Sequence, residues 1–89
     1  MPEIIVEIIN KRGLHARAAA KFVKIASVSA APVKVMKLNS DEHEVGGSSI
    51  LGLMMLGADP GSKLRITCND AQALKSLQEL VENKFGEGE

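Results

Sequence analysis

One histidine and one arginine stand where the spacing of apolar residues becomes helical. His15 directly precedes a stretch, residues 16–27, in which apolar side chains recur at helical intervals, and Arg17 falls in its first turn. Histidine is a poor helix cap beside serine, aspartate or asparagine, so helix stability does not explain its position. Arginine at a helix start opposes the helix dipole, which indicates an anionic partner. The backbone N–H groups of Ala16 and Arg17 would complete an anion-binding site.

This pair of residues is suited to phosphoryl chemistry. An uncharged imidazole at a helix start is a nucleophile that can accept a phosphoryl group. The new phosphate would lie among the first-turn N–H groups and the Arg17 guanidinium, whose charge-assisted hydrogen bonds would stabilise it. A second interpretation stays open from the spacing alone, because a lone histidine at a helix start is more often a solvated residue without chemistry.

The remaining elements must hold this helix start in place. Short alternating or β-branched segments predict four strands, at residues 3–9, 33–38, 43–45 and 63–68. Helical spacing predicts three helices. The first covers residues 16–27, and the second forms one or two turns within residues 50–56. The last is expected to begin at a capping box of Asn69 and Gln72 and to end at Gly86.

The order of these elements, β-α-β-β-α-β-α, predicts an α+β fold. Four half-buried strands with helices enough for only one face form a two-layer open-faced β-sandwich. The polar outward residues of the last strand indicate a wet second face, which is typical of an antiparallel sheet. We therefore expect a four-stranded antiparallel sheet with three helices on one face, in a single domain of residues 1–89.

Composition excludes several classes of function. Eleven basic residues balance eleven acidic ones and aromatic residues are only 2%, so neither the charge nor the stacking surface expected of a nucleic-acid-binding protein is present. The apolar runs are too short for a membrane helix, and we expect no secretory signal, because no basic segment followed by an apolar one opens the sequence. The single cysteine forms no metal-ligand spacing. We expect a cytoplasmic, monomeric protein without cofactor or metal.

A second informative segment runs from Gly46 to Gly57. One of two serines, Ser48 or Ser49, is expected to cap the short helix that follows. If Ile50 and Leu53 point inward, helical geometry turns three other apolar side chains outward: Leu51, Met54 and Met55. For Met55 a surface position and a core position are about equally favoured.

Other candidate residues carry simpler expectations. Three basic side chains would lie around the apolar surface of Leu51 and Met54 and attract acidic partners: Lys24, Lys21 and Arg12. The default interpretation is that these charges are simply solvated. His43 lies in an acidic segment and is expected to be an exposed strand residue, since a metal site with His15 lacks a third ligand. Cys68 alternates inward with Leu64 and Ile66 and is expected to be buried.

Both segments together resemble a known family. Gly13-Leu14-His15-Ala16-Arg17 and Ser48-Ser49-Ile50-Leu51-Gly52-Leu53-Met54-Met55-Leu56-Gly57 are similar, at their mutual spacing, to HPr, the histidine-containing phosphocarrier of the bacterial phosphotransferase system. The resemblance covers the whole chain. It implies that His15 accepts a phosphoryl group on Nδ1 from phospho-enzyme I, which takes it from phosphoenolpyruvate. His15 would then pass the group to an enzyme II A component or a related regulatory acceptor, with Arg17 as the active-site arginine.

The same resemblance suggests regulation and docking. Ser49, with Ser48 as second choice, matches the serine that an HPr kinase/phosphorylase modifies, and the adjacent apolar residues would contact several partners: Ile50, Leu51, Met54 and Met55. The chain departs from the family at Ala18, where proline is usual, so the helix start gains an N–H group. The alternative function is a non-catalytic regulatory module acting through phosphorylated Ser49 and the Leu51/Met54 surface. The sequence leaves open whether the chain serves sugar uptake or a nitrogen-regulatory branch with its own enzyme I paralogue.

Overall fold

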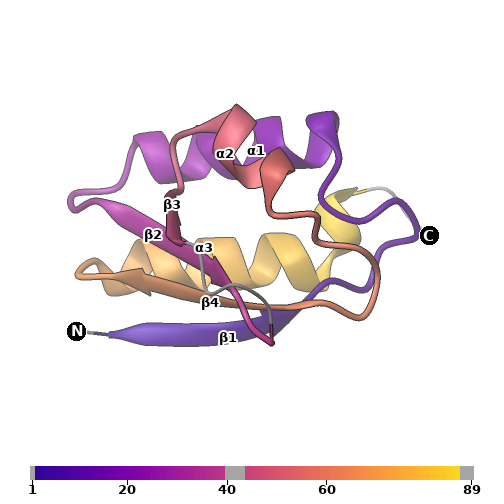
Figure 1. Cartoon of the computed structure of the whole chain (residues 1–89). Coiled ribbons are helices and arrows are strands. Elements are labelled where there is room, and N and C mark those ends of the chain that lie inside the picture. The colour runs from indigo at the N-terminus through magenta and orange to yellow at the C-terminus, as the bar shows by residue number, and fades with distance from the viewer. Residues whose placement is uncertain (1, 40–43, 87–89) are drawn as a thin grey trace.

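The computed structural model describes residues 2–39 and 44–86. Within these residues the chain forms four strands, three α-helices and a final 3-10 turn in the predicted order (Figure 1). The strands are β1 (Glu3–Glu7), β2 (Val33–Lys37), β3 (Glu44–Gly46) and β4 (Lys63–Cys68). The helices are α1 (Ala16–Ser27), α2 (Ile50–Met55) and α3 (Ala71–Glu82), followed by the turn η1 (Lys84–Gly86). The expectation for His43 concerns a position outside the described residues.

The strands form one antiparallel sheet in the order β1-β4-β2-β3, which confirms the predicted fold class. Register places Ile66 of β4 opposite Ile4 on one side and Val35 on the other, so the apolar alternations of three strands fall on the same face. The opposite face carries polar groups, among them Arg65, whose Nε lies 3.6 Å from a carboxylate oxygen of Glu3. In Figure 1 α3 lies behind the sheet, with α1 and α2 above.

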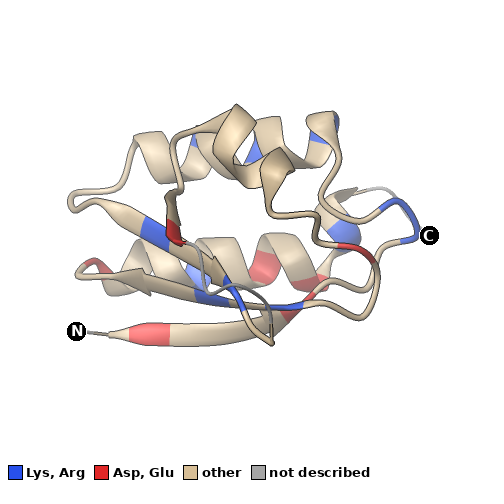
Figure 2. Ribbon diagram, viewed as in Figure 1, with Lys and Arg blue, Asp and Glu red and all other residues tan. Residues whose placement is uncertain are grey.

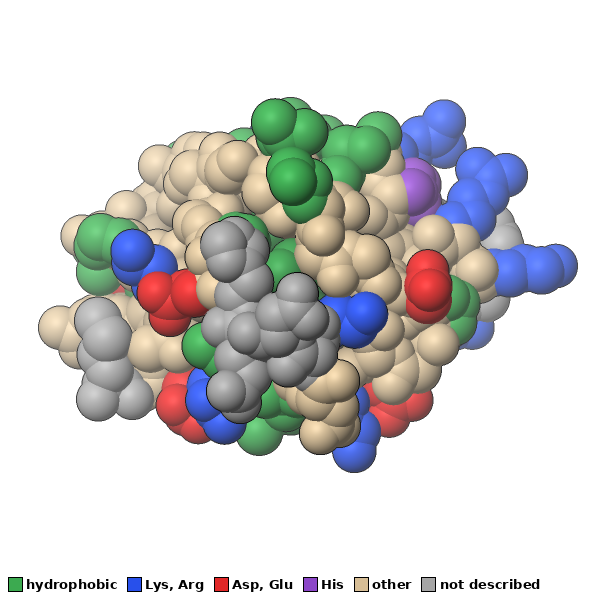
Figure 3. Space-filling model, in the orientation of Figure 1, with side chains coloured by type: hydrophobic (Ala, Val, Ile, Leu, Met, Phe, Trp, Pro, Cys, Tyr) green, Lys and Arg blue, Asp and Glu red, His purple; other side chains and the backbone are tan. Residues whose placement is uncertain are grey.

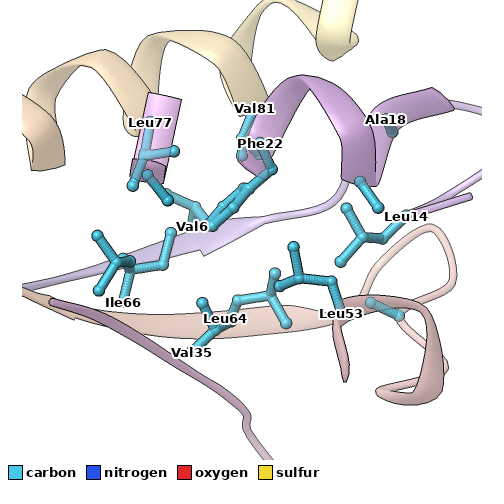
Figure 4. Close-up of a cluster of buried hydrophobic side chains, with 14 of the residues drawn as sticks. Val6, Leu14, Ala18, Phe22, Val35, Leu53, Leu64, Ile66, Leu77 and Val81 are labelled. Atoms are coloured by element: carbon cyan, nitrogen blue, oxygen red, sulfur yellow. The ribbon is translucent and has the colours of Figure 1, made fainter. Parts of the chain in front are cut away.

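The core lies between the buried sheet face and the helices. Figure 4 shows Phe22 of α1 and Leu77 of α3 pointing toward sheet residues such as Val6 and Ile66. Phe22, Leu77 and Ile66 are fully buried. Truncating a fully buried phenylalanine to alanine typically costs about 3–5 kcal/mol, so the position of α1 depends on this packing. Helix α1 cannot move far without losing it.

The structure corrects the predicted ends of α3. Asp70 is the N-cap residue, not Asn69, and its Oδ1 accepts hydrogen bonds from the backbone N–H groups of Gln72 and Ala73. The predicted capping box is therefore wrong, since Gln72 contributes its backbone N–H to the cap. The helix also ends at Glu82, before Gly86, and Phe85 reaches the core from η1 with a left-handed backbone, φ 54°. Burial of the Phe85 ring offsets the cost of that conformation.

Asp70 also joins α3 to the segment that follows α1. Its Oδ2 accepts a hydrogen bond from the Ala30 backbone N–H at 2.9 Å, and Ser29 Oγ lies 3.4 Å from the same oxygen. Hydrogen bonds from Ala30 first, then from the α3 backbone, hold the pKa of Asp70 below its usual value because they favour the ionised carboxylate. Next to this junction Cys68 is fully buried, as predicted, with Sγ 3.3 Å from Ser29 Oγ.

Candidate functional site

His15 is the N-cap residue of α1, in the predicted position. Its backbone is extended, with φ −84° and ψ −178°, and its side chain makes no capping hydrogen bond to the first turn. Its carbonyl oxygen accepts the first helical hydrogen bond, from Ala19 N at 2.8 Å. The N–H groups of residues 16–18 therefore come before the first intrahelical donor, which is the arrangement that makes a helix start an anion-binding site.

The residues at the start of α1 differ in how far they are exposed to solvent. His15 is half-buried, Ala16 and Arg17 are exposed, and Ala18 is fully buried. The first turn of α1 contains no acidic residue. The imidazole can thus be reached from outside, and the arginine beside it has no carboxylate in its own turn to neutralise it. Burial of Ala18 anchors the first turn of the helix.

The loop before His15 is held by close backbone packing. Gly13 has φ +66°, and a Cβ there would lie 2.5 Å from the carbonyl oxygen of Ala58. The next residue, Leu14, is buried and donates its backbone N–H to that same oxygen at 3.0 Å. Only glycine satisfies both the left-handed conformation and the approach of the Ala58 backbone. The sequence of residues 10–13 predicts only a polar connection that ends at Gly13, and it carries no signal of this contact with Ala58.

The site lies at a basic end of a chain whose formal net charge is zero. Residues 8–39 contain seven lysines and arginines and no acidic residue. Figure 2 shows basic positions on the loop before α1 and along α1 itself. Arg12 and Lys24 are exposed, as the docking prediction requires. Lys21 differs from the prediction, because it is half-buried and its Nζ donates a hydrogen bond to the carbonyl oxygen of Phe85.

Ser49 is the N-cap residue of α2. Its Oγ accepts a hydrogen bond from Gly52 N at 3.0 Å, which confirms the prediction that a serine caps this helix. Ser48 and Ser49 are both exposed. The preceding Gly47 fixes the approach to the cap, since a Cβ there would lie 2.6 Å from Val33 Cγ1.

An exposed apolar surface covers α2, and Figure 3 shows it beside the histidine, with basic side chains on the other side. Its four members are exposed by 43%, 69%, 43% and 75% respectively: Ile50, Leu51, Met54 and Met55. Ile50 is exposed, contrary to the condition that it points inward but as its place among the docking residues requires, whereas Leu53 is fully buried. A helix of six residues has too few turns to bury two rows of side chains, so Leu53 alone fills its core position.

The described ranges contain neither a metal-binding cluster nor a membrane-spanning helix. No group of three or more His, Cys, Asp or Glu side chains in residues 2–39 and 44–86 could hold a metal ion. Over the same residues, none of the helices has the length and apolar character needed to cross a membrane.

The fold and the site define a class of small two-layer α+β proteins that present a histidine at a helix N-terminus beside an exposed apolar surface. A family model described as the PTS HPr component phosphorylation site matches residues 2–83. The phosphocarrier protein HPr of Pseudomonas aeruginosa is 46% identical, with 100% of both chains covered. That of Neisseria meningitidis serogroup A is 45% identical over 94% of each chain.

Solved structures agree with these sequence relatives. The crystal structure of HPr-C-His from Thermoanaerobacter tengcongensis superposes with a TM-score of 0.87 at 40% identity, covering 98% of both chains. A phosphocarrier protein HPr from Bacillus anthracis gives a TM-score of 0.81 at 34% identity, covering 90% of this chain and 95% of that one. The chain belongs to the HPr family, the phosphocarrier proteins of the phosphotransferase system.

Proposed function

We propose that the chain carries a phosphoryl group on His15 between phospho-enzyme I, charged from phosphoenolpyruvate, and an enzyme II A component or related regulatory acceptor. The observation that carries this proposal is the position of His15: N-cap of α1, half-buried, and not engaged in capping the helix. A partner can reach such an imidazole, and the helix start beside it suits an anion.

In the proposed transfer, Nδ1 of His15 attacks the phosphorus atom in line with the bond to the donor enzyme. The new N–P bond forms as the bond to the donor breaks, and the electron pair of that bond leaves with the donor. The backbone N–H groups of Ala16 and Arg17 and the Arg17 guanidinium stabilise the phosphate on His15. Transfer to the acceptor reverses these steps. The chain is regenerated without net chemistry of its own, so it acts as a carrier rather than a turnover enzyme.

Docking of both partners is assigned to the apolar surface of α2. Leu51 and Met55 are its most exposed members, and flexible methionine side chains adapt to different partner surfaces. Lys24 on the neighbouring helix adds a positive charge that attracts acidic partners. Lys21 has a smaller part in docking, because its ammonium already bonds the Phe85 carbonyl oxygen.

Ser49 is proposed as the regulatory site of an HPr kinase/phosphorylase, with Ser48 as second choice. The Ser49 hydroxyl is exposed and lies at the start of α2, directly before the docking residues. Phosphorylation adds about −1.5 to −2 charges at pH 7. Burying that dianion against an acidic partner would require desolvation and like-charge contact, so docking and phosphoryl uptake would weaken.

The test is phosphorylation of the purified chain by phosphoenolpyruvate and enzyme I. One phosphate per chain is expected, labile in acid and stable in base, and absent from His15→Ala. Lys75→Ala, an exposed change on α3, is the control and should label like the wild type. Persistent labelling of His15→Ala would overturn the assignment. An unlabelled wild type that still binds partners through phosphorylated Ser49 would favour the alternative, a regulatory binding module.

A further inference from the structure

Asn10 is a polar residue buried in the loop that leads to His15. Its exposed fraction is 0%, and among the described residues no other polar or charged side chain is buried. Loop asparagines ordinarily face water, and burying an amide costs free energy unless it makes hydrogen bonds. Its burial therefore reflects a specific contact rather than a default of the fold.

That contact closes a turn over residues 10–13. The Asn10 side chain donates from Nδ2 to the carbonyl oxygen of Gly13 at 2.7 Å, and the Gly13 backbone N–H donates back to the Asn10 carbonyl oxygen at 3.2 Å. Side chain and backbone of one residue thus hold the same glycine. Asparagine at the first position of a turn is suited to this role.

The side-chain bond acts on the peptide unit that joins Gly13 to Leu14. The oxygen of this unit accepts from Asn10, and its N–H donates to the carbonyl oxygen of Ala58 at 3.0 Å. Because the C=O and N–H of a trans peptide point in opposite directions, the two bonds hold the planar unit from both sides. One residue further along the chain is His15.

We propose that Asn10 is a positioning residue for His15, acting through the Gly13–Leu14 peptide. This inference rests on the proposed phosphocarrier function. Without the Asn10 bond the peptide keeps one anchor, and it can rotate with the backbone of His15. The imidazole then samples orientations that take Nδ1 out of line with the donor or away from the first-turn N–H groups. Small misplacements of a reacting group can slow a transfer by as much as about a hundredfold.

The experiment compares Asn10→Asp, Asn10→Ala and Ser29→Ala. Asn10→Asp keeps the shape of the side chain and replaces the donating NH₂, whereas Asn10→Ala removes the group without adding charge. Ser29→Ala is the matched control, because Ser29 Oγ also donates to a backbone carbonyl, that of Ala31 at 2.6 Å, but beyond the opposite end of α1. Melting temperatures and circular dichroism establish that each variant is folded.

Two phosphorylation assays separate positioning from docking. Phosphoramidate transfers its phosphoryl group to histidine without a partner: the imidazole forms the N–P bond, the P–NH₂ bond breaks, and ammonia leaves with the imidazole proton. The rate for both Asn10 variants is expected to fall about tenfold. With enzyme I, kcat should fall similarly while KM for the carrier stays within about twofold, since the α2 surface is unchanged. Ser29→Ala should keep wild-type values in both assays.

The proposal is overturned if folded Asn10 variants react at the wild-type rate, or if Ser29→Ala slows both reactions equally. Hydrogen exchange of the Leu14 amide, which donates to Ala58, gives a second readout: exchange should be faster in Asn10→Ala than in the wild type, and equal protection in both would overturn the proposal. Failure of the proposed function looks different, because the wild type would then take no phosphate from phospho-enzyme I. The phosphoramidate rates and the exchange of the Leu14 amide would still test whether Asn10 positions His15.

Discussion

Lys37 Nζ donates a 2.9 Å hydrogen bond to the carbonyl oxygen of Gly57, just beyond the end of α2. Lys37 belongs to β2, so the bond ties a sheet strand to the C-terminal side of a six-residue helix. A cation is also favourable at the negative end of the helix dipole. With Ser49 capping the other end, both ends of α2 are held by side chains, which supports a helix too short to be stable alone.

Loss of the Lys37 bond should loosen α2. Lys37→Met is expected to lower the free energy of unfolding by about 0.5–1.5 kcal/mol, because one hydrogen bond to a carbonyl at a helix end is removed. Urea unfolding followed by circular dichroism measures the change. Lys34→Met on the same strand is the control, since Lys34 is exposed and pairs opposite Thr67 on the outer sheet face. Equal losses in both variants would contradict the assigned role.

Gly13 and Gly57 form a matched pair for testing the loop before His15. Their φ angles are +66° and +65°, but an added Cβ would meet the Ala58 oxygen at 2.5 Å at Gly13 and nothing within 4 Å at Gly57. Gly57→Ala should therefore cost about 1–2 kcal/mol from its left-handed backbone alone. Gly13→Ala should cost more and slow His15 phosphorylation, because the loop must also move away from Ala58. Thermal unfolding and enzyme I labelling measure both; similar losses would refute the packing argument.

The α2 surface can be tested against another exposed apolar residue. Leu51 is 69% exposed on α2, and Val28 is 83% exposed at the far end of α1 from His15. Leu51→Ser should raise the KM of enzyme I for the carrier about tenfold, since an apolar contact with the partner is lost. Val28→Ser should leave KM unchanged. Neither variant should alter the far-ultraviolet spectrum. An effect of Val28→Ser as large as that of Leu51→Ser would place the docking surface elsewhere.

Two substitutions at Ser49 separate capping from regulation. Ser49→Ala removes the acceptor for Gly52 N and should lower the free energy of unfolding by about 0.5–2 kcal/mol, with little effect on labelling of His15. Ser49→Asp keeps a capping oxygen and adds a negative charge beside the docking residues. It should slow labelling about fivefold or more with the fold intact. Wild-type kinetics in Ser49→Asp would remove the regulatory proposal in this form.

Asp70 predicts a pH dependence of stability. Backbone hydrogen bonds, that from Ala30 first, hold its pKa below the usual value of 3.8 in the folded chain. A carboxyl whose folded pKa is depressed stabilises the fold fully above its unfolded pKa and loses that contribution as pH falls through the folded pKa. Asp70→Asn should therefore flatten the acid side of the stability curve, from just above pH 3.8 downward. Asp59→Asn, an exposed loop change, is the control for unfolding measured at pH 2–6. An unchanged acid limb in Asp70→Asn would contradict this account.

Local patterns in the sequence were enough to predict the elements and the candidate histidine. The alternation in residues 63–68 and the helical spacing in residues 16–27 each depend only on which side of a single element is buried. The observed strand and helix begin and end at the predicted residues. The same holds for the serine cap of α2 and the inward position of Cys68, because both depend on near neighbours or on strand parity.

Tertiary packing decided the features that depend on contacts between distant segments. Asp70 replaces Asn69 as the cap because its second oxygen also bonds Ala30, forty residues away. Lys21 turns from solvent to the Phe85 carbonyl oxygen because η1 folds back onto α1. Ile50 stays exposed because Leu53 already fills the space beneath α2.

The loop before His15 also combines a feature that can be predicted from the sequence with one that depends on the tertiary structure. A turn ending at glycine can be read from residues 10–13, but its purpose depends on Ala58, which only the folded chain brings to Gly13 and Leu14. Backbone hydrogen bonds between distant loops have no residue code, since every residue type offers the same carbonyl oxygen. The sequence by itself therefore determined that a histidine begins α1, and the tertiary structure decided how firmly, and in which direction, that histidine is held.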